Sequence, residues 1–266
     1  MPMPHQPRPL AVVTGASTGI GYELAWLCAK NGFDLVVAAD EPEIDRAADD
    51  FRSLGAQVAS LIVDLSTLDG VDRLCDLVAA QGRPVEALCA NAGRGLGKAF
   101  LDQDFRRVRR MIDTNITGTV YLIHRLGQDM RARGHGRILI TGSIAGLIPG
   151  SFQAVYHATK AFIDNFAYGL QNELKDSGVT VSCLMPGATE TDFFRRADML
   201  DTPIGRSEKS DPAEVAEQGY AAMMKGEADV VSGWRNKLMV ALASITPAEM
   251  LAEQSRKIAA PDTARH

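Results

Sequence analysis

The chain has 266 residues, of which 46% are hydrophobic and 23% are charged. This composition is ordinary for a globular protein and supplies enough apolar residues for a sizeable core. The formal net charge of −5 argues against a nucleic-acid-binding surface, which normally carries a clustered basic excess. The one dense basic run, residues 106–110, alternates with apolar residues at helical spacing and is interpreted as the solvated face of an amphipathic helix.

The first eight residues are rich in proline and are expected to form a flexible end. This end has no apolar stretch typical of a signal peptide, and no apolar run elsewhere reaches membrane-spanning length. We therefore expect a cytoplasmic protein. The four cysteines lie far apart in apolar runs, which predicts buried thiols. Neither the cysteines nor the histidines have metal-ligand spacing, so no metal site is expected.

Short runs rich in Val, Ile and Leu recur along the chain and are typical of strands buried on both faces. They lie at Leu10–Val13, Leu35–Ala38, Val58–Val63, Val85–Cys89, Ile138–Thr141, Val179–Leu184 and Val230–Val231. Helical stretches lie between them, near Ile20–Lys30, Asp45–Leu54, Leu68–Ala80, Phe105–Arg131 and Phe152–Lys175. This alternation predicts one α/β domain over residues 1–266, a doubly wound (Rossmann) seven-stranded parallel sheet with helices on both faces.

Two later segments interrupt this alternation. Residues 192–211 form a long, partly polar stretch that carries aromatic side chains among charges, and we interpret it as a lid over the substrate site. A mobile surface loop is the alternative. Residues 247–266 are expected to form a last amphipathic helix and a tail.

A glycine-rich turn follows the first expected strand and opens into a helix. It reads TGASTGIG, and its candidate nucleotide contacts are Gly15, Ser17, Thr18, Gly19, Ile20 and Gly21. Small residues at these offsets let backbone N–H groups approach a pyrophosphate at the positive end of the helix. The turn alone is a weak signal, but doubly wound folds bind dinucleotides at this first strand-to-helix junction.

With this turn, the chain resembles the ordinary single-domain branch of the short-chain dehydrogenase/reductase family. Further motifs in the family's order end the third, fourth and sixth strands: Asp64-Leu65, Asn91-Ala92-Gly93, and Pro186-Gly187 followed by Thr189 and Thr191. The resemblance implies that the first motif lies at the adenine and the second beside the adenosine ribose. It implies that the two threonines hold the carboxamide of nicotinamide.

Tyr156 and Lys160 are spaced to lie one turn apart on the same face of a helix. A free tyrosine has a pKa of about 10, and a nearby ammonium together with oxidised nicotinamide would favour the phenolate. The resemblance implies that both residues contact the cofactor, with Lys160 donating to its ribose hydroxyls. Such a pair also arises by chance, so it needs support from other residues.

That support comes from Ser143, thirteen residues before the tyrosine, and from Asn115, both at the family's positions. The resemblance implies a catalytic tetrad of Asn115, Ser143, Tyr156 and Lys160, in which the serine binds the substrate oxygen and the asparagine holds a water. A helix cap and a mid-helix amide are the structural alternatives for the serine and the asparagine. We expect Tyr156 to remove the alcohol proton while a hydride passes to nicotinamide, and the reverse in reduction.

Asp40, at the end of the second strand, can accept hydrogen bonds from both adenosine ribose hydroxyls and would repel a 2'-phosphate. We therefore expect NAD, with NADP possible. The family's usual NAD-selecting aspartate falls one position earlier, where this chain has Ala39. The expected substrate surroundings are mainly apolar, which suggests a secondary alcohol or ketone: Arg94, Ile144, Leu147, Phe152, Gln153, Phe193 and Phe194.

The resemblance also implies a homodimer or homotetramer, formed through the helices expected at 105–131 and 152–175. Two other functions stay open at this point. A non-catalytic NAD(P)-binding regulatory protein could keep the same fold, although such proteins generally lose the tyrosine or the lysine. A transferase using S-adenosylmethionine would need the glycine-rich turn but would have no use for the tetrad.

Overall fold

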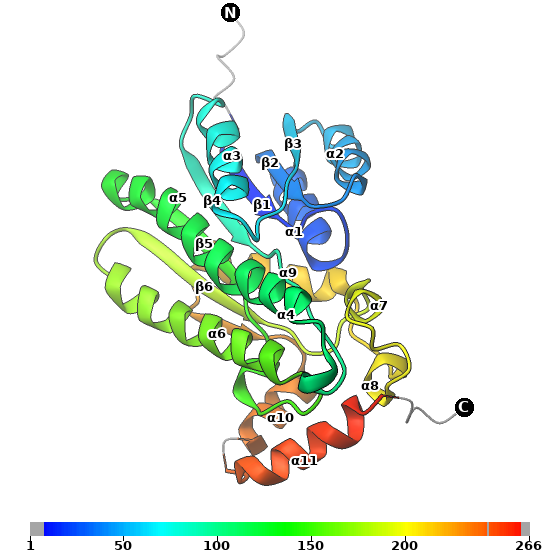
Figure 1. Cartoon of the computed structure of the whole chain (residues 1–266). Helices are drawn as coiled ribbons and strands as arrows, with labels where there is room; N and C mark the ends of the chain where they lie inside the picture. Colours follow the sequence, from blue (N-terminus) through cyan, green and yellow to red (C-terminus); the bar gives the residue numbers. More distant parts are fainter. Residues whose placement is uncertain (1–7, 244, 262–266) are drawn as a thin grey trace, which may run out of the picture.

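The computed structural model describes residues 8–243 and 245–261. Seven parallel strands form one sheet in the order β3-β2-β1-β4-β5-β6-β7 (Figure 1). Their bounds are β1 Leu10–Thr14, β2 Asp34–Ala39, β3 Val58–Ile62, β4 Val85–Ala90, β5 Gly136–Thr141, β6 Val179–Met185 and β7 Asp229–Val231. The predicted seven-stranded, doubly wound parallel sheet is confirmed.

Helices cover both faces of the sheet, so its central strands have no face toward water. On one face lie α1 (Gly19–Lys30), α2 (Glu43–Ser53) and α9 (Pro212–Lys225). On the other lie α3 (Leu68–Ala79), α5 (Thr119–Arg133) and α6 (Ala154–Leu174). All five residues of β1 are buried, which is why the sequence shows uninterrupted apolar runs instead of alternation.

The helix expected over residues 105–131 is three pieces in the structure. It consists of α4 (Phe105–Ile112), the π-helical turn η2 (Asp113–Gly118) and α5. Gly118 at the end of the wide turn packs so tightly on the carbonyl oxygen of Leu65 that a Cβ would overlap it. Such turns are rare and occur mostly as short insertions within α-helices, and this one contains no proline that would mark it in the sequence.

Besides two short helices within residues 192–211, two longer helices in the described part of the chain were missing from the sequence prediction, α9 and α10 (Trp234–Ala243). The sequence nevertheless contains a signal for the start of α9. Asp211 caps the helix through its side chain, and Pro212 occupies its first turn. The last helix, α11 (Ala248–Ala259), agrees with the amphipathic stretch expected from residue 247 onward.

The expected lid, residues 192–211, contains two short helices, α7 (Phe193–Arg196) and α8 (Pro203–Arg206). At the other end of the chain, Arg8 was expected in a flexible segment. Its guanidinium instead donates to the carbonyl oxygen of Gly32 at 3.0 Å and lies 3.8 Å from the carboxylate of Asp34. Residues 1–7 and 262–266 lie outside the described residues. Among those described, no helix combines the length and apolar character needed to cross a bilayer.

Candidate active site

A cavity of about 530 Å³ opens at the carboxyl ends of the strands, where doubly wound sheets bind ligands. Its lining comes from segments far apart in the sequence, including the turn after β1, the ends of β2 to β6, α6 and α7. Of the predicted site residues, all but Asn115 line it: Gly15, Ser17, Thr18, Gly19, Ile20, Gly21, Asp40, Asp64, Leu65, Asn91, Ala92, Gly93, Ser143, Tyr156, Lys160, Pro186, Gly187, Thr189 and Thr191.

The glycine-rich turn brings the backbone close to the cavity. Gly15 and Gly19 have φ of 66° and 61°, a left-handed conformation that glycine adopts without strain. A Cβ on Gly21 would overlap the carbonyl oxygen of Gly15, so the third glycine lets α1 pack against the turn. Thr18 precedes α1 without a side-chain cap, which leaves the first N–H groups of this helix for a ligand.

The turn is tied to the end of β4 by a residue that the sequence prediction missed. The Thr14 hydroxyl accepts hydrogen bonds from the backbone N–H groups of Asn91 and Ala92, both at 3.0 Å. In return, the Asn91 amide donates to the Thr14 carbonyl at 3.0 Å, while its oxygen accepts from the Thr141 hydroxyl at 3.1 Å. These hydrogen bonds hold the ends of β1, β4 and β5 together. The sequence signal for Thr14 was its position directly before Gly15, at the end of a buried strand.

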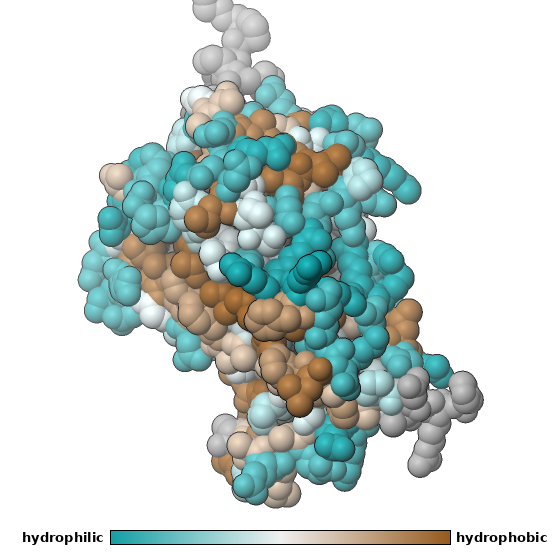
Figure 2. Space-filling model, viewed as in Figure 1, coloured by the Kyte–Doolittle hydropathy of each residue, from teal (hydrophilic) through white to brown (hydrophobic). Residues whose placement is uncertain are grey.

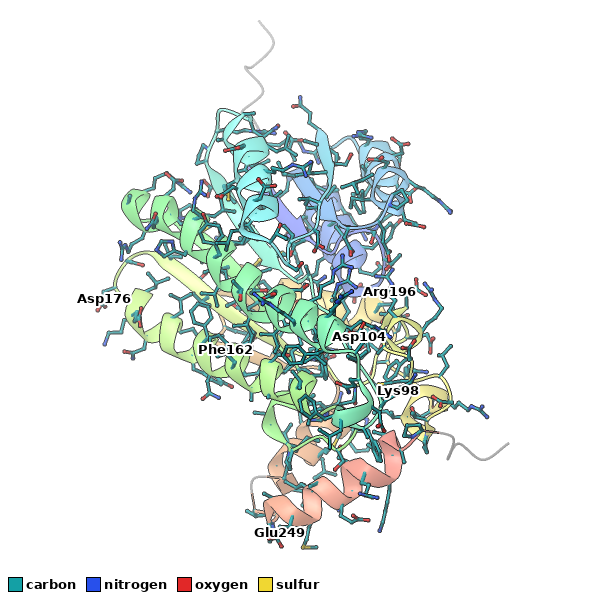
Figure 3. All side chains as sticks on the ribbon, viewed as in Figure 1. Lys98, Asp104, Phe162, Asp176, Arg196 and Glu249 are labelled. Atoms are coloured by element: carbon teal, nitrogen blue, oxygen red, sulfur yellow. The ribbon has the colours of Figure 1, made fainter. Side chains whose placement is uncertain are left out.

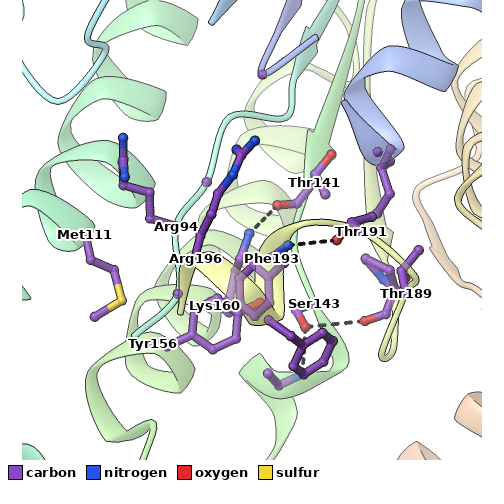
Figure 4. A pocket seen from close by; sticks show the side chains of 18 of the residues that line it. Arg94, Met111, Thr141, Ser143, Tyr156, Lys160, Thr189, Thr191, Phe193 and Arg196 are labelled. Atoms are coloured by element: carbon purple, nitrogen blue, oxygen red, sulfur yellow. Dashed lines mark hydrogen bonds between the residues drawn. The ribbon is translucent and has the colours of Figure 1, made fainter. Parts of the chain in front are cut away.

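Tyr156, Lys160 and Ser143 meet on one side of the cavity (Figure 4). The buried Lys160 ammonium donates to the Thr141 carbonyl at 2.8 Å. The Ser143 hydroxyl donates to the Pro186 carbonyl at 3.3 Å and accepts from the Ala145 N–H at 3.1 Å. The serine thus caps the short 3₁₀ turn that follows and also lines the cavity, so the two interpretations drawn from sequence coexist.

Burial dominates the acid–base properties of this group. It raises the pKa of Tyr156 to about 12, although a hydrogen bond with Ser143 lowers it in part. This is opposite to the lowering expected from a nearby ammonium, because loss of hydration disfavours the phenolate more than its surroundings favour it. Burial also lowers the pKa of Lys160, whereas the carboxylate of Asp164 raises it.

Asn115 lies in the π-helical turn η2, behind the cavity wall. Its side-chain oxygen accepts from the backbone N–H of Arg94 at 2.8 Å, and its amide donates to the Arg94 carbonyl at 2.9 Å and to the Thr159 hydroxyl at 3.0 Å. The side chain therefore joins the loop after β4 to α6. It is 2% exposed, so the structure shows it as a buried support.

Charged side chains crowd the opposite end of the cavity, near the end of β2. Asp40 pairs with Arg94 and lies 3.4 Å from Arg110, which also pairs with Asp64 at 2.7 Å. The Asp64 pKa would be raised by burial alone, but hydrogen bonds from Ser66 and the guanidinium of Arg110 lower it. The basic run on α4 is therefore not simply a solvated face, because Arg110 and Arg107 line the cavity.

The expected substrate surroundings are corrected in part. Ile144, Gln153, Phe193 and Phe194 line the cavity, whereas Leu147 and Phe152 do not. Arg94 also lines it, but its guanidinium points away from Tyr156 toward Asp40, so it belongs to the other end of the cavity (Figure 4). The prediction missed the contribution of the C-terminal helices, which depends on tertiary packing: Asn236, Met239, Ser255, Ile258 and Ala259.

The expected lid closes one side of the cavity. The ring of Phe193 lies 5.1 Å from that of Tyr156, measured between centroids. Arg196 on the same short helix reaches the β2 side, where it pairs with Glu41 at 2.6 Å (Figure 3). Arg107 on α4 pairs with Asp198 at 2.5 Å. The segment is therefore held from both sides of the cavity by ion pairs.

The parallel sheet, the glycine-rich turn at its first junction and the cavity at its carboxyl edge define a doubly wound α/β protein of the nucleotide-binding type. Residues 9–199 match the family model described as short chain dehydrogenase. The chain belongs to this family.

Known proteins similar to this chain agree with that assignment. A 3-oxoacyl-[acyl-carrier-protein] reductase of Aggregatibacter actinomycetemcomitans is 35% identical over 217 residues, which cover 77% of this chain and 87% of the relative. An uncharacterized oxidoreductase of Staphylococcus saprophyticus is 31% identical over 81% of this chain and 91% of its own length. A short-chain dehydrogenase from Sphingobium yanoikuyae, solved in complex with NADPH, has a TM-score of 0.78 at 26% identity, covering 92% of this chain and 99% of that one.

Proposed function

We propose that this chain is a nicotinamide-dependent oxidoreductase that interconverts a secondary alcohol and a ketone. The observation that carries the proposal is the meeting of Tyr156, Ser143 and Lys160 in the same cavity as the uncapped start of α1. One end of the cavity offers backbone N–H groups to a pyrophosphate, and the other offers hydroxyls to a carbonyl or carbinol oxygen. The similarity to a 3-oxoacyl-[acyl-carrier-protein] reductase supports this class of substrate.

The residues present fit a dinucleotide. The left-handed glycines and the close approach of Gly15 and Gly21 leave room for a pyrophosphate at the backbone, and the cavity volume lies within the range of about 300–1,000 Å³ usual for ligand sites. When bound, nicotinamide supplies the hydride acceptor or donor. Asp64 and Asn91 would lie along the adenosine half, and Thr189 and Thr191 along the nicotinamide half.

In this proposal, the chain's own residues orient the substrate and move one proton. Ser143 Oγ has one proton, which turns from the Pro186 carbonyl to the substrate oxygen when substrate binds. Tyr156 Oη gives a proton to that oxygen in reduction or takes it in oxidation. Lys160 Nζ holds the Thr141 carbonyl and places its positive charge under the site. Asn115 acts through the loop that it supports, and Phe193 together with the C-terminal helices excludes water.

We propose NAD as the preferred nucleotide, on the strength of Asp40. Its carboxylate would accept from the adenosine ribose hydroxyls and repel a 2'-phosphate. Arg94 and Arg110 beside it would attract such a phosphate. The preference for NAD over NADP therefore depends on the ion pairs by which Asp40 neutralises both guanidiniums. The NADPH complex of the Sphingobium relative makes NADP the competing nucleotide.

The decisive experiment is a titration of the protein with NADH and with NADPH, followed by nicotinamide fluorescence. Wild type should bind NADH more tightly. Asp40→Ala should weaken NADH binding and strengthen NADPH binding, since two arginines are then left without their carboxylate. The control Asp49→Ala removes an exposed carboxylate on α2 and should change neither affinity. Preference of wild type for NADPH would overturn the role of Asp40, and binding of neither would overturn the proposal.

A panel of secondary alcohols with NAD then tests for hydride transfer. Nucleotide binding without turnover of any alcohol would favour a non-catalytic regulatory protein of the same fold. The cytoplasmic location and the homo-oligomer expected from the sequence stay predictions.

A further inference from the structure

Asp164 is a buried carboxylate on α6, one helical turn beyond Lys160 and 1% exposed. The backbone N–H of Ser143 donates to its Oδ1 at 3.3 Å, and the Cys183 thiol on β6 lies 3.7 Å from the same oxygen. Its Oδ2 is buried and has no hydrogen-bond partner among the described residues. Burial raises the pKa of this carboxyl to about 6, while the Lys160 ammonium lowers it in part. A group held at this cost in the core calls for an explanation.

Two glycines are fitted around this carboxylate. A Cβ on Gly142 would overlap Oδ1, and a Cβ on Gly146 would overlap Oδ2. Gly142 directly precedes Ser143, and Gly146 lies within the short turn that the serine caps. The loop after β5 is therefore shaped to receive the side chain of Asp164 from α6.

Lys160 and Asp164 both form hydrogen bonds with the backbone at the end of β5. The ammonium holds the carbonyl of Thr141 at 2.8 Å, and the carboxylate holds the N–H of Ser143 two residues later. Both contacts come from adjacent turns of one helix, which also carries Tyr156. The position of the Ser143 hydroxyl relative to Tyr156 is thus set by α6 through backbone groups.

We infer that Asp164 is a positioning residue, which fixes the Ser143 hydroxyl for the substrate oxygen by holding the backbone N–H of Ser143. This inference rests on the proposed function for its catalytic consequence. The hydrogen bond between the Ser143 N–H and the Asp164 carboxylate does not depend on the proposed function and can be measured separately.

The test compares three variants. Asp164→Asn keeps an acceptor oxygen for the Ser143 N–H, and its amide nitrogen takes the place of the unpartnered Oδ2. Asp164→Leu has a similar size and no acceptor. Glu173→Gln removes an exposed carboxylate from the same helix and is the matched control. Circular dichroism melting shows that each variant is folded before it is used.

Hydrogen exchange followed by mass spectrometry is the first readout. In Asp164→Leu, the peptide covering residues 139–147 should contain one amide that exchanges about tenfold faster, because the N–H of Ser143 has lost its charged acceptor. Asp164→Asn and Glu173→Gln should exchange as wild type does. Equal exchange in wild type and in Asp164→Leu would overturn the inference, whatever the enzyme does with alcohols.

Steady-state oxidation of the best alcohol from the panel is the second readout. Asp164→Leu should lose about tenfold to 100-fold in kcat, as expected for a displaced catalytic group, with less than about a threefold change in the Kd for NADH. Asp164→Asn should restore kcat to within about threefold of wild type. An unchanged kcat in Asp164→Leu would overturn the positioning role. If wild type itself turns over no alcohol, the proposed function fails, and the exchange measurement still decides the hydrogen bond.

Discussion

At the scale of single residues, Tyr156 has the property that most constrains the chemistry. With its pKa raised to about 12, the phenol stays protonated throughout the neutral range in the chain by itself. A protonated phenol is suited to give a proton to a ketone oxygen. Oxidation requires the phenolate, which only a further positive charge in the site, such as oxidised nicotinamide, would favour.

Replacing Tyr156 by Phe should therefore abolish proton transfer while leaving the nucleotide end of the cavity intact. We expect kcat for ketone reduction to fall about 1,000-fold, with the affinity for NADH changed by less than about threefold. Steady-state kinetics and nicotinamide fluorescence measure the two quantities. Tyr168→Phe, on the exposed side of α6, is the control. A Tyr156→Phe variant with wild-type kcat would show that another group transfers the proton.

Asp164 gives a prediction for stability against pH. Its folded pKa of about 6 lies above the model-compound value of 3.8, so the folded state binds this proton more tightly than the unfolded state does. The resulting stabilisation is fully present below pH 3.8 and is lost as the pH rises through 6. At about 1.4 kcal/mol for each pH unit between the two values, the loss is about 3 kcal/mol.

Asp164→Asn does not titrate, so its unfolding free energy relative to wild type should increase by this amount between about pH 4 and pH 7. Urea denaturation at a series of pH values gives the difference, in which the titrations of all other groups largely cancel. A pH-independent difference for Asp164→Asn would mean that the carboxyl titrates normally in the folded chain.

Among the helices, two glycines differ in how closely their surroundings are packed. Gly219 on α9 faces β6, where a Cβ would lie 2.7 Å from a methyl group of Leu184. Gly169 on α6 is exposed, and a Cβ there would meet nothing within 4 Å. The sequence does not distinguish these two glycines, but the structure predicts opposite effects when each is replaced by alanine.

Gly169→Ala should stabilise the protein by about 0.5–1 kcal/mol, because alanine loses less conformational entropy in a helix. Gly219→Ala should destabilise it by about 1–3 kcal/mol, because the added methyl group overlaps the buried side chain of Leu184, so that this side chain or α9 must move. Chemical denaturation of both variants measures the two changes. A stabilising Gly219→Ala would show that α9 shifts freely on β6.

At the scale of the whole molecule, the face formed by α5 and α6 carries an apolar band (Figure 2). Phe162 (Figure 3) and Tyr168 on α6 are 46% and 41% exposed. The ring of Phe162 stacks on that of Phe166, with 6.4 Å between the ring centroids. Contiguous exposed apolar residues of this kind are typical of an interface between subunits. This supports the homo-oligomer that the sequence resemblance implies.

Phe162→Glu should place two charges in such an interface, one from each subunit, and dissociate the oligomer. Size-exclusion chromatography with light scattering should give at least a dimer for wild type and a monomer for the variant. Met224→Glu, on α9 at the opposite face of the sheet, should leave the mass unchanged. A monomeric wild type would remove the oligomer prediction altogether.

The sheet, its strands and most of the cavity lining could be predicted from the amino-acid sequence. Strands buried on both faces have continuous apolar runs, and residues at the carboxyl ends of parallel strands must meet at one edge, so motifs that end β1, β3, β4 and β6 could be placed together without a structure. The spacing of Tyr156 and Lys160 fixed their common helix face.

The contacts of those residues could not be predicted, because they depend on how distant segments pack together. Three contacts join positions far apart in the chain: the ion pair of Arg94 with Asp40, the hydrogen bond of Asn115 with the loop after β4, and that of Asp164 with Ser143. No local sequence pattern predicts such contacts. The same holds for the raised pKa of Tyr156, because burial depends on everything packed around the phenol.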